Sequence, residues 1–79
     1  MQINVKYFGK IAEQTHKMEE VIDISSIGED LSSLRAFCFR KYEITDDESV
    51  QLAVNQAITI NTKLQAGDEV VFLPPFSGG

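Results

Sequence analysis

The stretch that decides the fold is AGDEVVFLPP, residues 66–75. Ala66-Gly67-Asp68 predicts a turn, and residues 69–73 (EVVFL) then form an apolar run typical of a central strand covered on both faces. Pro74 and Pro75 end the strand, because proline cannot donate to a ladder and two in succession favour polyproline II. We therefore expect the chain to leave the sheet at residue 74 and to finish in the tail PPFSGG.

The beginning of the chain also reads as strand. Apolar and polar side chains alternate along residues 2–8 (QINVKYF), with Phe8 on the polar side, which predicts a half-buried strand. Residues 10–14 have room for one helical turn, and residues 17–24 (KMEEVIDI) predict a second strand in a hairpin with the first. The second pattern is imperfect, because Glu20 shares its side with apolar residues.

The middle of the chain predicts one main helix over residues 31–42. Asp30 is placed to cap it, since its carboxylate can accept from the free N–H groups of the first turn. Arg40 and Lys41 suit the negative end of the helix dipole. The apolar positions that recur at helical spacing are Leu31, Leu34, Phe37, Cys38 and Tyr42.

The segment after the helix predicts an exposed acidic loop over 43–49, a strand over 50–54 and a short apolar run over 57–60. Asn55 can take the positive φ that a turn needs between the last two. This order favours a two-layer α+β domain, with a mixed sheet of about five strands and one helix packed across it. If the last strand lies parallel beside the first at the sheet centre, the fold is the β-grasp. We expect residues 1–73 to form this domain and 74–79 a flexible tail.

Length and charge exclude several functions. With 79 residues the chain is too short for a Rossmann domain or a TIM barrel. Its 7 basic and 12 acidic residues give a net charge of −5, which opposes binding to nucleic acid or to anionic membranes. A single cysteine and the absence of a long apolar run favour a cytoplasmic protein without a membrane span.

Side chains for catalysis are scarce. His16 and Cys38 are the only histidine and thiol, so the chain cannot supply a zinc site, and we expect no metal. We interpret His16 as an exposed loop residue and Cys38 as a small apolar residue on the core side of the helix. The acidic run 46–48 (Asp46, Asp47 and Glu48) is interpreted as a solvated loop, with a basic partner surface or weak cation binding as the alternative. We therefore expect no enzymatic activity from the chain alone.

The tail is the exception, although fraying is the ordinary fate of such a terminus. It follows the best strand directly, its two prolines stiffen the exit, and its last two residues carry no side chain, so it can enter a narrow channel. Six residues reach up to ~20 Å at ~3.3 Å each. A terminal carboxylate becomes reactive once activated, for example as an acyl-adenylate. That intermediate then yields a thiocarboxylate in a sulfur carrier, or a thioester in a protein modifier.

The chain resembles the MoaD family, the small sulfur-carrier subunits of molybdopterin synthase. The resemblance spans the whole length and is strongest over 53–79. The residues that carry it are Val5-Lys6-Tyr7-Phe8, Ala53-Val54-Asn55-Gln56, Leu64, Gly67-Asp68-Glu69-Val70 and Phe72-Leu73-Pro74-Pro75-Phe76-Ser77-Gly78-Gly79. Phe76 departs from the smaller aliphatic residue that is usual there, which affects the fit of the tail rather than the chemistry.

The resemblance implies a β-grasp fold and a reaction cycle. A ubiquitin-activating-like adenylyltransferase (MoeB-like) would use Mg-ATP to adenylate Gly79, and a cysteine desulfurase or rhodanese would supply sulfur for a thiocarboxylate. The tail would then enter the large subunit of a heterotetramer and donate sulfur to cyclic pyranopterin monophosphate, forming the molybdopterin dithiolene. No cofactor would stay bound to the chain. The residues that would thread the channel are Pro74, Pro75, Phe76, Ser77 and Gly78.

A docking face is also expected for that partner. Phe8 is a large apolar residue on an otherwise polar side of its strand, and Leu73 ends the last strand at the root of the tail. Together with Ile58 and Phe76 they would form an apolar patch. The alternative is that Ile58 and Leu73 are ordinary core.

Three other functions remain open. A ThiS-like sulfur carrier for thiazole synthesis shares the fold and the Gly-Gly end, but those chains are usually shorter and lack the Pro-Pro pair. A ubiquitin-like modifier would form isopeptides with lysines. A binding domain with an idle tail would keep its function without Gly78 and Gly79.

Overall fold

A computed structural model describes residues 1–44 and 49–74 of the chain. The acidic run 46–48 and the tail from residue 75 onward lie outside these described residues. The elements in chain order are β1 (Gln2–Tyr7), α1 (Gly9–Thr15), β2 (Glu19–Asp23), α2 (Leu31–Tyr42), β3 (Gln51–Val54), β4 (Ala57–Ile58) and β5 (Glu69–Leu73).

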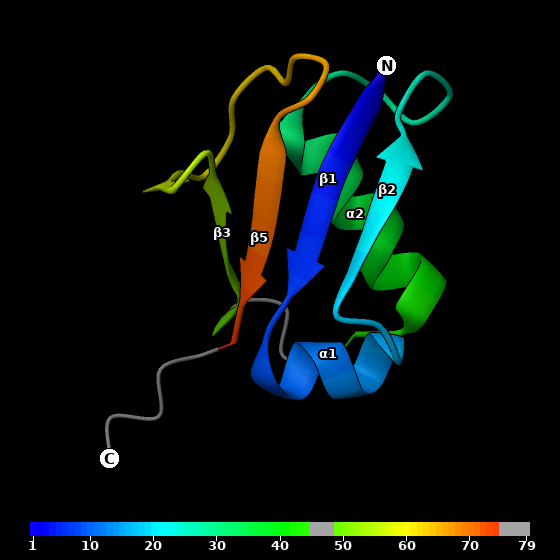
Figure 1. Cartoon of the computed structure of the whole chain (residues 1–79), viewed down its shortest axis with the longest axis vertical. Helices are drawn as coiled ribbons and strands as arrows, with labels where there is room; N and C mark the ends of the chain where they lie inside the picture. The colour runs from blue at the N-terminus through cyan, green and yellow to red at the C-terminus, as the bar shows by residue number, and fades with distance from the viewer. Residues whose placement is uncertain (45–48, 75–79) are drawn as a thin grey trace.

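The strands form one mixed sheet in the order β2-β1-β5-β3-β4 (Figure 1). β5 is central and runs parallel to β1, whereas its other neighbour β3 is antiparallel to it. β1 and β2 form the expected antiparallel hairpin, with α1 in the connection. The predicted α+β fold with a β-grasp topology is therefore confirmed.

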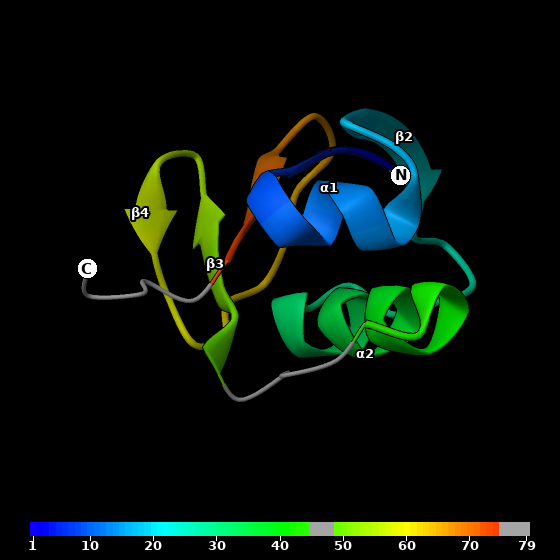
Figure 2. The ribbon, with the colours of Figure 1, turned by 90° about the horizontal axis from the view of Figure 1, so that it is seen from below.

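The core lies between the sheet and α2, which packs across one face only (Figure 2). We call this face of the sheet the inner face. Ile3, Val5 and Tyr7 of β1 are buried there against Leu34 and Cys38 of α2, as the alternation and the helical spacing predict. α1, a two-turn helix rather than the single turn expected, crosses the end of the sheet where β1 finishes (Figure 1).

Residues with positive φ follow both helices and form the turn of the β3–β4 hairpin. His16 follows α1 with φ 62°, and Glu43 follows α2 with φ 52° and donates its N–H to Phe39 O. Asn55 (φ 49°) and Gln56 (φ 73°) make the two-residue turn between β3 and β4, so the prediction for Asn55 is confirmed. Such a turn favours residues that tolerate a left-handed backbone.

The predicted helix cap is only half right. Asp30 occupies the N-cap position of α2, but its carboxylate makes no capping bond and instead accepts from Ser33 Oγ at 2.5 Å. The N–H of Ser32 donates to Asn61 Oδ1 at 3.0 Å, and the N–H of Leu31 donates to Thr62 O at 2.8 Å. A segment distant in sequence therefore accepts the hydrogen bonds of free N–H groups in the first turn of α2.

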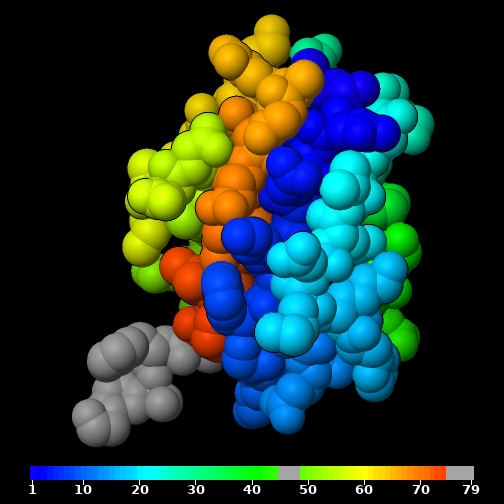
Figure 3. Space-filling model, in the orientation of Figure 1, coloured from blue at the N-terminus to red at the C-terminus, as the bar shows by residue number. Residues whose placement is uncertain are grey.

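The prediction that the last strand is covered on both faces is wrong. Val70 and Phe72 of β5 are fully buried, but Glu69, Val71 and Leu73, which alternate with them, stay half-buried. Figure 3 shows the face of the sheet opposite α2, where side chains of β1, β2 and β5 lie at the surface. No element of the described part of the chain covers this outer face.

Candidate functional site

The root of the tail is held by neighbouring backbone on both sides. Leu73 pairs with Gln51 of β3, and on the other side the N–H of Phe8 donates to Phe72 O at 3.3 Å. Pro74 packs against Gly9, where a Cβ would come within 3.1 Å of Pro74 Cγ. Gly9 also has φ 56°, so both the close approach and the backbone conformation favour glycine there.

Five residues of the predicted tail, from Pro75 through Phe76, Ser77 and Gly78 to Gly79, lie outside the described residues. The described chain ends at Pro74, directly after the central strand. The predicted reacting end of the chain therefore follows the central strand of the sheet.

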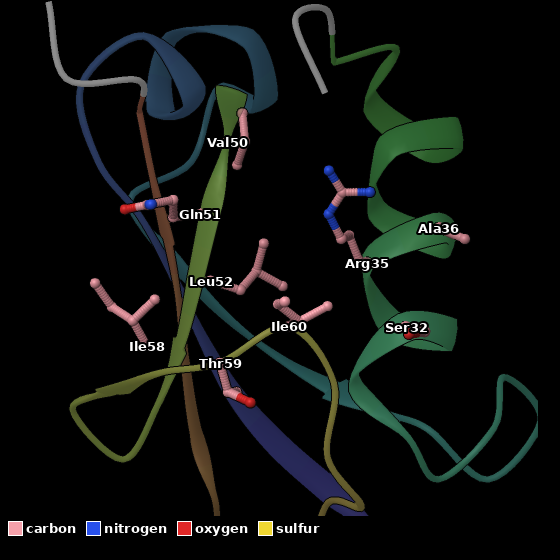
Figure 4. Close-up of a pocket in the computed structure, with 9 residues that line it drawn as sticks. All are labelled: Ser32, Arg35, Ala36, Val50, Gln51, Leu52, Ile58, Thr59 and Ile60. Carbon is pink, nitrogen blue, oxygen red and sulfur yellow. The ribbon is translucent and has the colours of Figure 1, made fainter. Parts of the chain in front are cut away.

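The strand register brings the predicted docking residues onto the outer face. Ile58 pairs with Ala53, Ala53 pairs with Val71, and Leu73 is two residues further along β5 on the same side. Figure 4 shows Ile58 and Gln51 on the side of β3 away from Leu52 and from α2. Phe8 continues β1 beside Leu73. We call Phe8, Ile58, Val71 and Leu73 the outer apolar patch.

The exposure of the predicted docking residues excludes the alternative that Ile58 and Leu73 are ordinary core residues. Ile58 is 62% exposed, Phe8 is 47% exposed and Leu73 is half-buried. An apolar patch of this kind on a small domain is typical of a protein–protein contact.

The motifs that carried the resemblance form a clamp at the other end of β5. Asn55 donates its backbone N–H to Glu69 O at 2.8 Å, and its Oδ1 accepts from the Glu69 N–H at 3.0 Å. Its Nδ2 donates to Asp68 Oδ1 at 3.0 Å, while Asp68 Oδ2 accepts from the Gln65 N–H. These bonds explain why Asn55 and the Gly67-Asp68-Glu69 turn belong to one pattern, since together they fix the start of the strand that ends at the tail.

A largely buried carboxylate went unrecognised in the sequence. Glu20 Oε2 accepts from Tyr7 Oη at 2.6 Å and from Tyr42 Oη at 2.5 Å, and Lys17 Nζ lies 3.4 Å from Oε1. Burial raises the pKa of the Glu20 carboxyl, but the hydrogen bonds from Tyr42 and Tyr7 and the charge of Lys17 together outweigh burial, so the pKa is lowered. The only sequence signal was the polar residue at an inward position of β2, which the two tyrosines explain.

The single thiol is held in an unreactive state. Cys38 is fully buried, with Sγ 3.7 Å from Tyr7 Oη, and burial raises the pKa of the thiol to about 11. Tyr7 already donates its only hydroxyl proton to Glu20, so the thiol is the donor to Tyr7. A protonated, enclosed thiol is a poor nucleophile, which agrees with the interpretation of Cys38 as a core residue. His16, at the end of α1, is exposed as expected.

The described residues offer no other obvious catalytic constellation. A hollow of about 470 Å³ lies between α2 and β3, and it is lined by Arg35 and Ser32 on the helix and by Leu52 and Ile60 on the sheet side (Figure 4). In residues 1–44 and 49–74, no three His, Cys, Asp or Glu side chains gather as metal ligands. Within the same ranges, no helix has the length and hydropathy needed to cross a membrane.

The sheet has five strands, one helix packs across it, and the last strand, β5, lies at its centre. This arrangement defines a ubiquitin-like β-grasp protein. The chain belongs to the ThiS family, whose family model matches residues 5–79.

Relatives agree with the resemblance drawn from the motifs. The chain is 36% identical over 83 residues to the molybdopterin synthase sulfur carrier subunit of Mycobacterium tuberculosis, covering 100% of this chain and 99% of that one. The resemblance to this kind of sulfur carrier is therefore confirmed.

Solved structures show the same fold. In a complex of subunits 1 and 2 of molybdopterin-converting factor from Helicobacter pylori, the matching chain is 26% identical with a TM-score of 0.65, and each chain is covered over 100%. Small archaeal modifier protein 1 from Methanosarcina acetivorans matches at 23% identity with a TM-score of 0.75, covering 99% of this chain and 96% of that one. The latter identity is low enough that it supports the fold alone.

Proposed function

We propose that the chain is the sulfur carrier subunit of molybdopterin synthase and that Gly79 carries the sulfur as a thiocarboxylate. The observation that carries the proposal is the match to the Mycobacterium tuberculosis carrier over the whole chain, including the Gly-Gly end. The attachment of the tail to the central strand supports it, because the root of the tail is fixed and Phe72, the last buried residue described, comes before the tail.

The chemistry requires activation before transfer. An adenylyltransferase resembling ubiquitin-activating enzymes joins the Gly79 carboxylate to the α-phosphate of Mg-ATP, and pyrophosphate leaves. A protein persulfide, formed by a cysteine desulfurase or a rhodanese, then attacks the acyl carbon and displaces AMP. A second thiol cleaves the resulting acyl disulfide, which releases the thiocarboxylate and leaves a disulfide on the donor protein. The chain itself contributes the carboxylate and a tail that can enter the partner, with Gly78 providing clearance and Mg-ATP held by the activating enzyme.

The acceptor site belongs to a partner under this proposal. The Helicobacter pylori complex supports a second, larger subunit, whose pocket would receive the tail and bind cyclic pyranopterin monophosphate. The outer apolar patch would dock on that subunit, two copies of each would form the working heterotetramer, and the chain would not be an enzyme alone. The net charge of −5 suits such a protein partner in the cytoplasm.

Reconstitution tests the proposal. Full-length chain, its activating enzyme, Mg-ATP, a sulfur donor, the large subunit and the pterin precursor should together yield molybdopterin. Deletion of Gly79 should abolish product while the melting temperature stays unchanged, because the tail lies beyond the buried strand residues. A deletion variant that retains full activity would contradict the proposal, and product formed only in a thiazole-forming assay would transfer the chain to the ThiS-like pathway.

A further inference from the structure

A charged hollow adjoins the outer apolar patch. The register places Lys6 opposite Glu19 of β2 on one side and opposite Val71 of β5 on the other, all on the outer face. Glu69 lies on the same face, paired with Asn4. A hollow of about 380 Å³ is lined by these residues together with Val5 and Glu20, whose side chains belong to the inner face. We define the charged hollow by its outward-facing residues, which are Asn4, Lys6, Glu19, Val21 and Glu69.

The charges in the hollow do not balance. Lys6 Nζ lies 3.1 Å from Glu69 Oε2, so the one ammonium group is engaged by one carboxylate. The Glu19 carboxylate is exposed and forms no ion pair within the described residues. The Glu20 carboxylate is engaged on the inner face by the hydroxyls of Tyr7 and Tyr42. On the outer face the hollow therefore carries two carboxylates against one ammonium group, beside the half-exposed apolar side chain of Val21.

The hollow and the outer apolar patch are continuous, because Lys6 of the first pairs directly with Val71 of the second. A partner that covers the patch therefore also covers the hollow. Desolvating an unbalanced carboxylate is unfavourable unless the partner supplies a positive charge. The partner surface that fits is therefore apolar, with an adjacent lysine or arginine.

We propose that the large subunit places a basic side chain against the Glu19 carboxylate in the charged hollow when it docks on the outer face. This inference rests on the proposed function. It adds a specific electrostatic contact to the apolar docking surface, and it makes binding dependent on salt as well as on Phe8, Ile58 and Leu73.

A matched pair of charge reversals tests the inference. Glu19→Lys alters the hollow, whereas Glu29→Lys alters an exposed residue before α2, and each changes the net charge of −5 by two units to −3. Titration calorimetry of full-length chain with purified large subunit should show about tenfold weaker binding for Glu19→Lys and a change within about twofold for Glu29→Lys. Raising NaCl from about 50 mM to about 300 mM should narrow the difference between the two variants.

A second variant guards against misfolding. Glu69→Gln removes the other carboxylate without reversing charge, and its side chain contacts only Lys6 among the bonds described. It should also weaken binding, with an unchanged melting temperature. Equal affinities of Glu19→Lys and Glu29→Lys for the large subunit, or tighter binding of Glu19→Lys, would each overturn the inference. So would a Glu19→Lys variant that binds the activating enzyme more weakly but binds the large subunit as the wild type does.

Failure of the inference differs from failure of the proposed function. If the wild-type chain binds the large subunit and the two reversals behave alike, only the electrostatic contact is refuted. If the wild-type chain does not bind the large subunit at all, both are refuted.

Discussion

Phe8 is the side chain at which the proposed docking face can be tested most directly. It is 47% exposed and continues β1 beside the root of the tail, so it adds little to the core. We expect Phe8→Ala to weaken large-subunit binding by about 1–2 kcal/mol, or roughly tenfold, because aromatic anchors dominate interfaces of this kind. The loss of folding stability should be smaller.

Ile60→Ala is the control for that measurement. Ile60 is 94% exposed and apolar, but it lies on the α2 side of β3 (Figure 4). Its replacement should leave affinity unchanged. If Phe8→Ala and Ile60→Ala bind equally well, Phe8 does not belong to the docking face.

Asn61 is the residue that caps α2 in place of Asp30. Its Oδ1 accepts from the N–H groups of Ser32 and Thr62, both at 3.0 Å. Asn61→Ala should lower the free energy of unfolding by about 1 kcal/mol, the usual value of a helix cap. In a domain of this size that equals a fall in melting temperature of about 4–8 °C.

Asn61→Asp keeps the accepting oxygen and adds a negative charge near the positive end of the helix dipole. Thermal unfolding of this variant should match or exceed that of the wild type. A loss as large as that of Asn61→Ala would show that the capping bond is not the stabilising feature.

At the scale of elements, Glu20 joins β2 to β1 and to the end of α2 through the hydroxyls of Tyr7 and Tyr42. Its side chain is only 11% exposed, so Glu20→Gln leaves hydroxyl donors poorly matched in a largely buried place. We expect a loss of about 1–3 kcal/mol in the free energy of unfolding at neutral pH.

The pH dependence of that loss has a defined sign. Because the pKa of Glu20 is lowered on folding, its charge stabilises the fold above the ordinary value of 4.5, and this stability disappears as pH falls through the folded value. The difference between wild type and Glu20→Gln should therefore shrink in acid. Asp23 also has a lowered pKa, of about 2, from its hydrogen bonds with Ser25, but it is present in both proteins and cancels in the comparison. A difference that stays constant from neutral pH to pH ~3 would contradict the account.

Element boundaries followed from local patterns. The helix over 31–42 and the strand over 69–73 were predicted from apolar spacing and from the prolines, and both have the expected bounds. These signals are local, so the sequence carries them in full.

Features that depend on distant segments were not predictable in the same way. The cap of α2 comes from Asn61, 29 residues beyond the Ser32 N–H that it accepts from, and the partners of Glu20 lie on two other elements. The exposed side of β5 was misjudged because an apolar run shows that a strand is central but not whether anything covers its second face. That uncovered face is also the predicted docking surface, so the local rule failed where a partner is expected.

At the scale of the whole molecule, the described residues form a fixed body that precedes the proposed reacting end. The Asn55 clamp fixes the beginning of β5, and Phe8, Gly9 and Gln51 hold its end at Pro74. A rigid root reduces the entropy lost when a partner orders the residues beyond it. Under the proposed function, the body therefore supplies docking and position, and the chemistry is left to Gly79 and to the partners.

The measurement that tests the central claim most directly is the mass of the C-terminal peptide, isolated after reaction with the activating enzyme, a sulfur donor and Mg-ATP. We predict a gain of about 16 Da on Gly79; digestion is needed because oxidation of methionine or cysteine elsewhere gives nearly the same change in intact mass. A carboxylate left unchanged by a demonstrably active activating enzyme, or a Gly79 joined to a lysine of another protein, would contradict the sulfur-carrier account.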